Sequence, residues 1–323
     1  MYATTGERRS RPTDGWAPAQ ASQRSGRPVG RPLTRALASA YAVSLLVAAL
    51  VAVVSAAGLA FRFTGLYGAD PNAAVGIIAS TAGILVPGFF AHDVFNLAVA
   101  LPLLLATLWL ARRGAPAGLL LWPGVLFCVL YTYAQYLVGA PFGPLFLAHA
   151  LLVVLSAYAV IGLIASIDGD AVRARLAGAV PVRSAGGILV ALGLMTLGQD
   201  AGGAIADAFV GGATLEPLSR YAWTADLVLE VPAVLVGGVL LWRRHPLGYV
   251  AGAGLLLQFA LTPVALAAVM ALQPWLTGTP VDVGMIAGVL IFAAVPFAPL
   301  ALFVRAAGRP SPRPGWTAEG SHA

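Results

Sequence analysis

Long apolar runs dominate this sequence and leave it few folds to adopt. Three of them follow one another between Phe89 and Tyr158, and their polar residues gather toward one end of each run. A helix needs about 20 predominantly apolar residues to cross a bilayer. By that length we predict eight spans, at residues 35–61, 91–111, 117–138, 144–166, 185–209, 223–242, 247–272 and 283–304. The expected fold class is an all-α, polytopic transmembrane helical bundle.

The composition excludes a soluble domain and one class of membrane protein. Of the 323 residues, 59% are hydrophobic and only 10% are charged, whereas soluble domains carry about 25% charged residues. All 19 Lys and Arg residues are arginines, and without lysine the chain cannot be a retinal protein, which needs a Schiff-base lysine. The single cysteine, Cys128, excludes an intramolecular disulfide and is expected to pack as a small apolar side chain.

The arginines predict how the chain is oriented, because cytoplasmic ends of spans are enriched in Lys and Arg. With the N-terminus in the cytoplasm, 17 of the 19 arginines fall on the cytoplasmic side, and only Arg62 and Arg220 fall outside. We therefore predict a multi-pass protein of the bacterial inner membrane with both termini in the cytoplasm. Residues 1–33 and 307–323 contain few large apolar side chains and are expected to be disordered cytoplasmic tails, on either side of a transmembrane domain at 34–306.

Spans two and six resemble each other, which predicts an internal repeat. One contains Asp93, Pro102, Trp109 and Arg112-Arg113, and the other contains Asp226, Pro232, Trp242 and Arg243-Arg244. An even number of spans in each half gives a parallel 4+4 repeat, related by an axis along the membrane normal. Before span two, the apolar run at 75–86 is too short to cross the membrane, and we expect a re-entrant or interfacial segment there.

Polar side chains inside a membrane are costly, so each is a candidate for function. Ten of them form the predicted polar pocket: His92, Asp93, Asn96, Tyr131, Gln135, Tyr136, His149, Asp226, Glu230 and Gln258. In span three, helical spacing puts Tyr131 with Gln135 on one face and Tyr133 with Tyr136 on another. The predicted orientation brings most of the ten to one depth near the outer surface, so the pocket is expected to face outward.

Several of these residues also have a structural interpretation. Asp93 and Asp226 suit helix N-termini, the tyrosines suit an aromatic belt, and Gln258 suits a bond between helices. Glu230 lies about one turn, roughly 5–6 Å, deeper than Asp226, and two ionised carboxylates that close repel each other in a medium of low dielectric constant. We therefore expect Glu230 to be either protonated or paired with a cation, with His149 or His92 as its protein partner.

Motif searches leave the activity open. The sequence contains no HExxH, HxxxH, Walker or GxSxG motif. We predict no cofactor, no metal and no nucleic-acid partner, and a lipid bilayer and an unknown small solute or ion as partners. Three functions stay open: a transporter-like protein for a small solute, a proton or a cation; a membrane enzyme that uses His and carboxylate groups as metal ligands or as acid and base; and a structural or partner-binding subunit. The pairs Gly248–Gly252 and Gly284–Gly288 suit tight helix crossings and are compatible with a homo-oligomer.

Three stretches together carry a resemblance. They are the HDxxN motif that begins at His92, the block YTYAQYLVGAPFGPLFLAHALLVVLSAYAVI that begins at Tyr131, and the region from Asp226 and Pro232 to WRRHPLGYV. Within residues 89–270 the chain resembles a set of bacterial multi-pass membrane proteins of unassigned function. The resemblance implies a membrane protein and says nothing about activity.

Overall fold

Each of the eight predicted spans is a helix in the computed structural model, which describes residues 35–64, 82–140, 144–210, 222–278 and 280–309. Within these residues there is no strand. In this described part of the chain, eight helices are long and apolar enough to cross a membrane: 37–60, 88–112, 116–139, 146–166, 182–209, 222–242, 246–272 and 283–308. The predicted all-α polytopic bundle is confirmed, and the protein is an integral membrane protein.

The helices divide into two groups of four spans. The first group consists of α1 (Arg35–Thr64), α2 (Ala82–Phe95) continued by η1 (Asn96–Ala100) and α3 (Leu101–Arg112), α4 (Pro116–Gly139) and α5 (Phe146–Ser166). A short helix, α6 (Gly169–Leu176), leads to the second group. That group consists of α7 (Val182–Val210), η2 (Asp226–Glu230) continued by α9 (Val231–Trp242), α10 (Pro246–Thr277) and α11 (Val283–Gly308).

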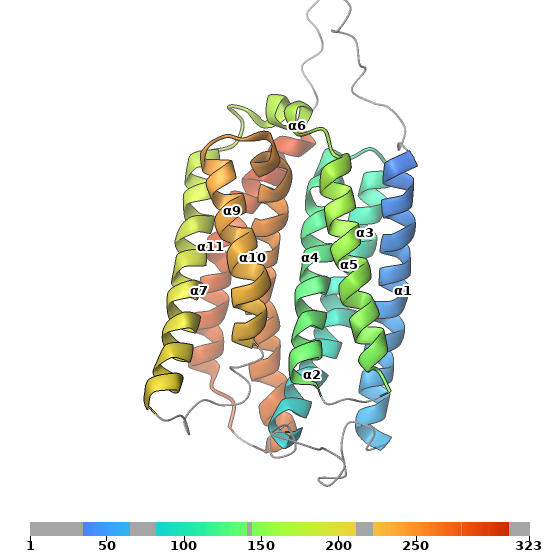
Figure 1. The fold of residues 1–323 in the computed structure, drawn as a ribbon, viewed down its shortest axis with the longest axis vertical. Coiled ribbons are helices and arrows are strands. Elements are labelled where there is room, and N and C mark those ends of the chain that lie inside the picture. Colours follow the sequence, from blue (N-terminus) through green and yellow to red (C-terminus); the bar gives the residue numbers. More distant parts are fainter. Residues whose placement is uncertain (1–34, 65–81, 141–143, 211–221, 279, 310–323) are drawn as a thin grey trace, which may run out of the picture. The chain divides into compact units, whose positions relative to one another are not determined.

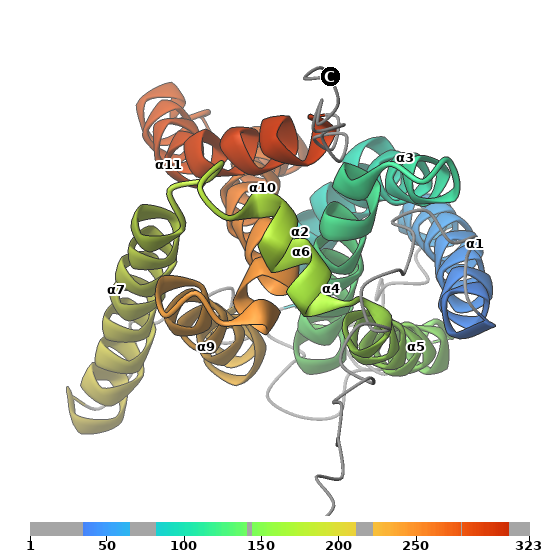
Figure 2. The ribbon, with the colours of Figure 1, turned by 90° about the horizontal axis from the view of Figure 1, so that it is seen from above.

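Helices α4 and α10 face each other at the centre of the bundle (Figures 1 and 2). In the first half, α4 packs on α3 and α5, and α1 packs on both of these from the other side. The second half repeats this arrangement, because α10 packs on α9 and α11, while α7 packs against them both. The two halves meet mainly where α10 contacts α4 and α2.

Two glycines allow the central helices to approach closely. A Cβ atom on Gly254 would lie 2.9 Å from the backbone nitrogen of Gly124, and one on Gly124 would collide with the backbone of Gly254. Small residues at a crossing let two helix backbones come into contact. By contrast, Gly284 and Gly288 lie on the exposed face of α11, with no atom closer than 3.4 Å to a Cβ built on either, so this pair forms no tight crossing within the described part of the chain.

The halves match at a constant separation of 130 positions, which supports the predicted 4+4 repeat. The matching pairs are Asn96 and Asp226, Pro102 and Pro232, and Gly124 and Gly254. The register predicted from the sequence was wrong, because Asp226 is the counterpart of Asn96 rather than of Asp93, and Trp242 does not match Trp109. The prediction matched the charged residues of the two halves, whereas in the structure the π-helical turns and the prolines of the two halves correspond.

Each half contains one turn of π-helix at the same place. The N–H of Leu101 bonds the carbonyl of Asn96, and the N–H of Val231 bonds the carbonyl of Asp226, five residues back in each case. The prolines that follow, Pro102 and Pro232, have no N–H to continue an α-helical ladder. Turns of this kind are frequent at functional sites, and here they begin at two of the predicted site residues.

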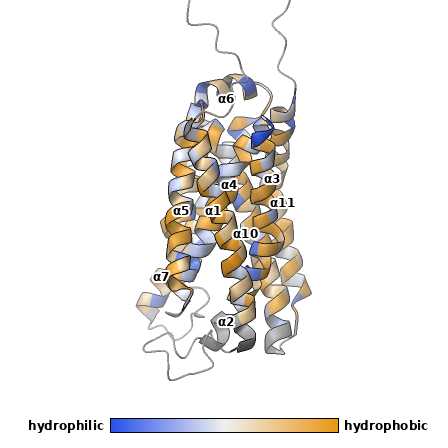
Figure 3. Cartoon of the chain, turned by 90° about the vertical axis from the view of Figure 1, so that its right-hand side faces the viewer, coloured by the Kyte–Doolittle hydropathy of each residue, from blue (hydrophilic) through white to orange (hydrophobic). Residues whose placement is uncertain are grey.

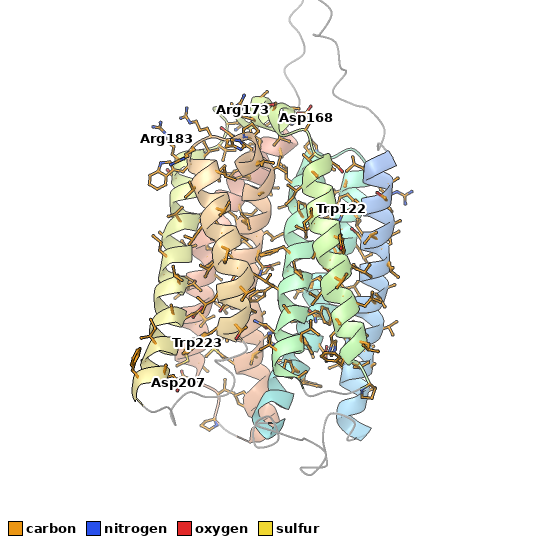
Figure 4. All side chains as sticks on the ribbon, in the orientation of Figure 1. Trp122, Asp168, Arg173, Arg183, Asp207 and Trp223 are labelled. Atoms are coloured by element: carbon orange, nitrogen blue, oxygen red, sulfur yellow. The ribbon has the colours of Figure 1, made fainter. Side chains whose placement is uncertain are left out.

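The outer surface of the bundle suits lipid. Large apolar side chains point away from the protein, among them Phe209 (86% exposed) and Leu147 (78% exposed), and apolar colours prevail along the spans in Figure 3. Helix α6 is polar and lies across the ends of α10 and α11. Its N-terminus is capped by Asp168, whose Oδ1 accepts from the Ala171 N–H at 3.1 Å. Arg173 and Arg183 mark this end of the bundle, which we call the arginine end (Figure 4).

Two predicted boundaries need correction. Helix α2 starts at Ala82, before the predicted start of span two at residue 91. Residues 82–86, the last five of the apolar run at 75–86, therefore belong to this helix and not to a separate re-entrant or interfacial segment. The first part of this run, 75–81, lies outside the described residues, as do the whole predicted N-terminal tail, 1–33, and residues 310–323 of the predicted C-terminal tail. At the other end, α11 continues to Gly308, two residues beyond the predicted limit of the transmembrane domain.

Candidate functional site

Trp223 and Asp207 mark the end of the bundle opposite to the arginine end (Figure 4). Asp226 and Glu230 follow Trp223 on the same helix, whereas Gln258 lies near the middle of α10. Nine of the ten predicted polar residues are buried, and Asp226 is partly buried.

The prediction of a single pocket was wrong in one respect, because these residues lie in two places on opposite sides of α4. One side holds Asp93, Asn96, Tyr136 and His149, and the other holds Tyr131, Gln135, Asp226, Glu230 and Gln258, near a cavity that His92 also lines. The two faces of α4 were predicted correctly: Tyr133 and Tyr136 point into one cluster, and Tyr131 and Gln135 point toward the other.

The first cluster, which we call the aromatic cluster, draws on all four spans of the first half. Its members are Ser55, Asp93, Asn96, Tyr133, Tyr136 and His149. The Tyr136 hydroxyl lies 2.8 Å from Oδ1 of Asp93 and 3.0 Å from the carbonyl oxygen of Phe89. The expected contact between span two and span three therefore exists.

Ring packing completes this cluster. Tyr133 and Tyr136 stack with 5.3 Å between ring centroids, and the His149 ring lies 4.7 Å from that of Tyr136. The Ser55 hydroxyl lies 3.0 Å from the Tyr133 hydroxyl and accepts from the Asn96 amide at 3.4 Å. Since α1, α2, η1, α4 and α5 all contribute, these contacts fix the four spans of the first half to one another.

The second cluster, the carboxyl cluster, consists of Asp200, Asp226 and Glu230. The Tyr131 hydroxyl donates to Oδ1 of Asp226 at 2.5 Å. Asp200 of α7 lies within hydrogen-bonding reach of Asp226. The cluster thus joins α7 and η2 of the second half to α4 of the first.

Glu230 is held by α10. Its Oε1 accepts from the Thr262 hydroxyl at 2.9 Å and from the Gln258 amide at 3.2 Å. The predicted partners, His149 and His92, were wrong. His149 lies in the aromatic cluster on the far side of α4, and the Nδ1 of His92 lies 3.1 Å from the carbonyl oxygen of Gly88. Residue order fixed the depth of these groups, but it did not fix how each helix is rotated.

Neither aspartate acts as a helix cap. Helix α2 begins at Ala82, well before Asp93, and the helix that contains Asp226 begins at Ala222. Both carboxyl groups instead accept from tyrosine hydroxyls of α4. Gln258 does bond between helices, as the structural interpretation predicted, but its partner is the buried Glu230.

A cavity of about 450 Å³ opens between the two halves next to the carboxyl cluster. Residues of both halves line it, with His92, Cys128, Tyr131 and Gln135 on one side and Asp200, Trp223, Asp226 and Gln258 on the other. The rest of the lining consists of three polar residues, Thr132, Gln199 and Thr262, and a larger apolar part: Ala222, Leu261, Ala265, Leu266, Val269, Met270, Met285 and Val289. Among the aromatic-cluster residues, none is part of this lining.

Sequence reasoning missed several residues of these clusters. Asp200 was not among the predicted site residues, because the clean apolar run of span five stops at Gln199, although α7 continues through Asp200 as a helix. Thr262 and Ser55 are small hydroxyl residues inside apolar spans, and no spacing pattern distinguishes them from residues that bond their own backbone. Cys128 is buried as expected, but it also lines the cavity.

Within the described part of the chain, no three His, Cys, Asp or Glu side chains are arranged to hold a metal ion. No family model, no curated protein and no solved structure matches the chain.

Proposed function

We propose that this membrane protein is transporter-like and carries a small solute, together with a proton or another cation, through the cavity between its halves. One observation carries the proposal: the cavity of about 450 Å³ lies between two matching four-helix groups and is lined by residues of both. Secondary transporters commonly bind their substrate between structural repeats and change access by rocking one repeat against the other.

The contact between Gly124 and Gly254 supplies a pivot for such a motion. Both glycines precede, along their helices, every residue of α4 and α10 that lines the cavity. Rocking of one half about this contact would widen or narrow the cavity without breaking either group of four spans. The aromatic cluster would move as part of the first half.

The carboxyl cluster supplies the groups for coupling. Asp200 and Asp226 line the cavity. Glu230 is not part of the described lining, and its carboxyl group accepts hydrogen bonds from Gln258 and Thr262. Ionisable groups inside a membrane are typical of ion and proton pathways. In the proposed mechanism a proton or cation held by these carboxyl groups moves with the solute.

The proposed orientation puts the arginine end in the cytoplasm of a bacterial cell and the cavity near the outer surface. Reporter fusions test this at exposed turns. Fusions at Gly114 and Gly178 should report the cytoplasm, and one at Gly278 should report the exterior. A cytoplasmic signal at Gly278 would contradict the orientation and the outward-facing cavity.

The native cysteine tests the transport proposal directly, because Cys128 is the only cysteine of the chain and lines the cavity. A membrane-impermeant maleimide would be applied to right-side-out and to inside-out vesicles that contain the full chain. Labelling from both sides is the expected result for alternating access, and the Cys128→Ser variant should show none. Labelling from the exterior alone would overturn transport and leave a binding protein or an enzyme. Protection on both sides would favour a structural subunit.

A further inference from the structure

We infer that the cavity binds an organic ammonium ion, meaning a protonated amine that carries an apolar substituent. This inference rests on the proposed function and names the substrate class of the same cavity. Three features of the lining support it: unpaired acceptor atoms, donors that are already used, and an apolar wall that includes an aromatic ring.

Three buried acceptor atoms on the lining have no hydrogen-bond partner within the described part of the chain. They are Oδ2 of Asp200, Oε1 of Gln135 and Oε1 of Gln258, on side chains that are 2%, 5% and 0% exposed. Asp226 lies within hydrogen-bonding reach of Asp200, but both groups are carboxyls, so this contact contains a donor only when one of them is protonated. Buried polar groups are nearly always satisfied in folded proteins. Three unsatisfied acceptors around one cavity therefore indicate a ligand or solvent molecule that donates hydrogen bonds.

The donors of the same residues already have partners. The Gln258 amide nitrogen donates to Glu230, and this contact fixes which end of the amide faces the carboxyl group. Gln135 hydrogen-bonds the Tyr131 side chain, whose hydroxyl in turn donates to Asp226. Because these donors are already paired, the atoms of Gln135 and Gln258 that are left without a partner are acceptors.

His92 is the only basic side chain on the described lining. When its ring is neutral, it contributes a hydrogen-bond acceptor and no positive charge. The Nδ1 of His92 faces the Gly88 carbonyl, which can only accept, so this nitrogen carries the hydrogen. In the neutral ring Nε2 is then an acceptor. No arginine belongs to the described lining. A carboxylate or phosphate solute would meet carboxyl groups there and no complementary charge.

The apolar wall distinguishes an organic cation from an inorganic one. Trp223 lines the cavity, and its ring packs on Gly203 of α7, where a Cβ atom would collide with it. Aromatic rings attract ammonium groups through the cation–π interaction. A volume of about 450 Å³ is in the range of small-molecule sites. A bare metal ion would use the acceptors and leave Trp223 and the two methionines, Met270 and Met285, without a contact.

The experiment measures ligand-induced thermal stabilisation of the full chain in mild detergent. Three probes of similar shape would be compared: phenethylammonium, phenethyl alcohol and phenylacetate, with sodium and potassium chloride at equal ionic strength as further arms. We expect the ammonium probe to bind at least tenfold more tightly than the alcohol or the carboxylate. Asp200→Asn and Asp226→Asn should each weaken it about tenfold. Asp282→Asn, at the exposed N-cap of α11, keeps the capping oxygen and should leave binding unchanged.

A second measurement serves if the aspartate variants do not fold. In the unmodified chain, phenethylammonium should slow maleimide labelling of Cys128 at least fivefold, whereas phenethyl alcohol at the same concentration should not. Equal or better binding of the carboxylate or the alcohol would overturn the inference while the proposed function stands. The same shift with sodium or potassium alone would also overturn it, in favour of an inorganic cation site. Absence of any probe effect would overturn it too, and labelling from both membrane sides would then decide the proposed function separately.

Discussion

The two halves of this protein have the same backbone arrangement but carry different side chains at matching positions. Each half has a π-helical turn, a proline two residues beyond it and a central glycine. At the start of the turn the first half has Asn96 and the second has Asp226; at its end the first has Ala100 and the second has Glu230. The first half therefore uses the turn to bind its own spans together, and the second uses it to hold two carboxyl groups.

This difference separates a structural role from a functional one. The hydrogen bonds of the aromatic cluster join spans of the first half, and none of its residues lines the cavity. Three of its buried atoms, Asp93 Oδ2, Asn96 Oδ1 and His149 Nε2, have no hydrogen-bond partner in the described part of the chain. The carboxyl cluster reaches across to α4 and borders the cavity. We expect substitutions in the first cluster to lower stability and substitutions in the second to change ligand binding as well.

The largest effect is expected where the halves touch. Gly124→Ala would push a methyl group into the backbone of Gly254, and neither backbone can move away without separating α4 from α10. We expect a loss of about 3 kcal/mol in the free energy of unfolding, or failure to assemble, since overpacking typically costs ~1–3 kcal/mol and sometimes more. Thermal unfolding in detergent measures it. Gly162→Ala is the matched control, because no atom lies within 4 Å of its added Cβ; equal losses in both variants would refute the close contact.

Removing the carboxyl group that distinguishes the second half should have the next largest effect. Glu230→Ala removes the buried acceptor that the Thr262 hydroxyl and the Gln258 amide share. Among the described residues, these two then have only each other, through the Gln258 backbone carbonyl oxygen at 3.2 Å and the Thr262 hydroxyl at 3.1 Å, and the polar atoms of Asp226 lose a neighbour in the same cluster. An unsatisfied buried polar group costs about 1–3 kcal/mol. Glu230→Gln keeps a carbonyl oxygen for both donors and should unfold close to the unmodified chain. If chemical denaturation gives the same loss for Ala and Gln, the hydrogen bonds to Glu230 are not the stabilising element.

A smaller effect is expected in the aromatic cluster. Tyr136→Phe keeps the ring stacking but removes the hydroxyl that contacts Asp93. We expect a loss of about 1 kcal/mol, the usual net contribution of one hydrogen bond, without a change in binding of the ammonium probe. The control is Tyr158→Phe, since Tyr158 is 71% exposed. A change in probe binding, rather than in the unfolding midpoint, would show that the two clusters are not separated in role.

The smallest expected effect concerns the last span of each half. Helix α11 is capped by Asp282, whose Oδ1 accepts from the Met285 N–H at 2.9 Å, whereas α5 has no side-chain cap at Leu145. Asp282→Ala should cost about 0.5–1 kcal/mol, near the lower end for loss of an N-cap. Amide hydrogen exchange should show the change confined to the first turn of α11. Faster exchange throughout the second half would mean that the cap stabilises more than its own helix.

Much of the fold could be predicted because membrane spans are set by local composition. Apolar runs and arginine-rich ends identify eight spans. A segment in lipid has to be helical when its backbone N–H and C=O groups can only bond to one another, so an apolar run of sufficient length predicts a helix. The spacing of Tyr131, Tyr133, Gln135 and Tyr136 also gave the two polar faces of α4 correctly. Helical periodicity relates residues within one span, so this much needed no tertiary information.

The partners of each polar residue could not be predicted in the same way. Span order and depth put Glu230, His149 and His92 at one level, yet packing turns Glu230 toward Thr262 and Gln258 of α10 and His149 toward Tyr136. The rotation of each span about its axis depends on close contacts such as that of Gly124 with Gly254 and on the π-helical turns. The sequence alone determined that this chain crosses a membrane and where along each span its polar groups lie. Only the tertiary structure decided which of them meet, because helix rotation is set by packing between spans that are far apart in the chain.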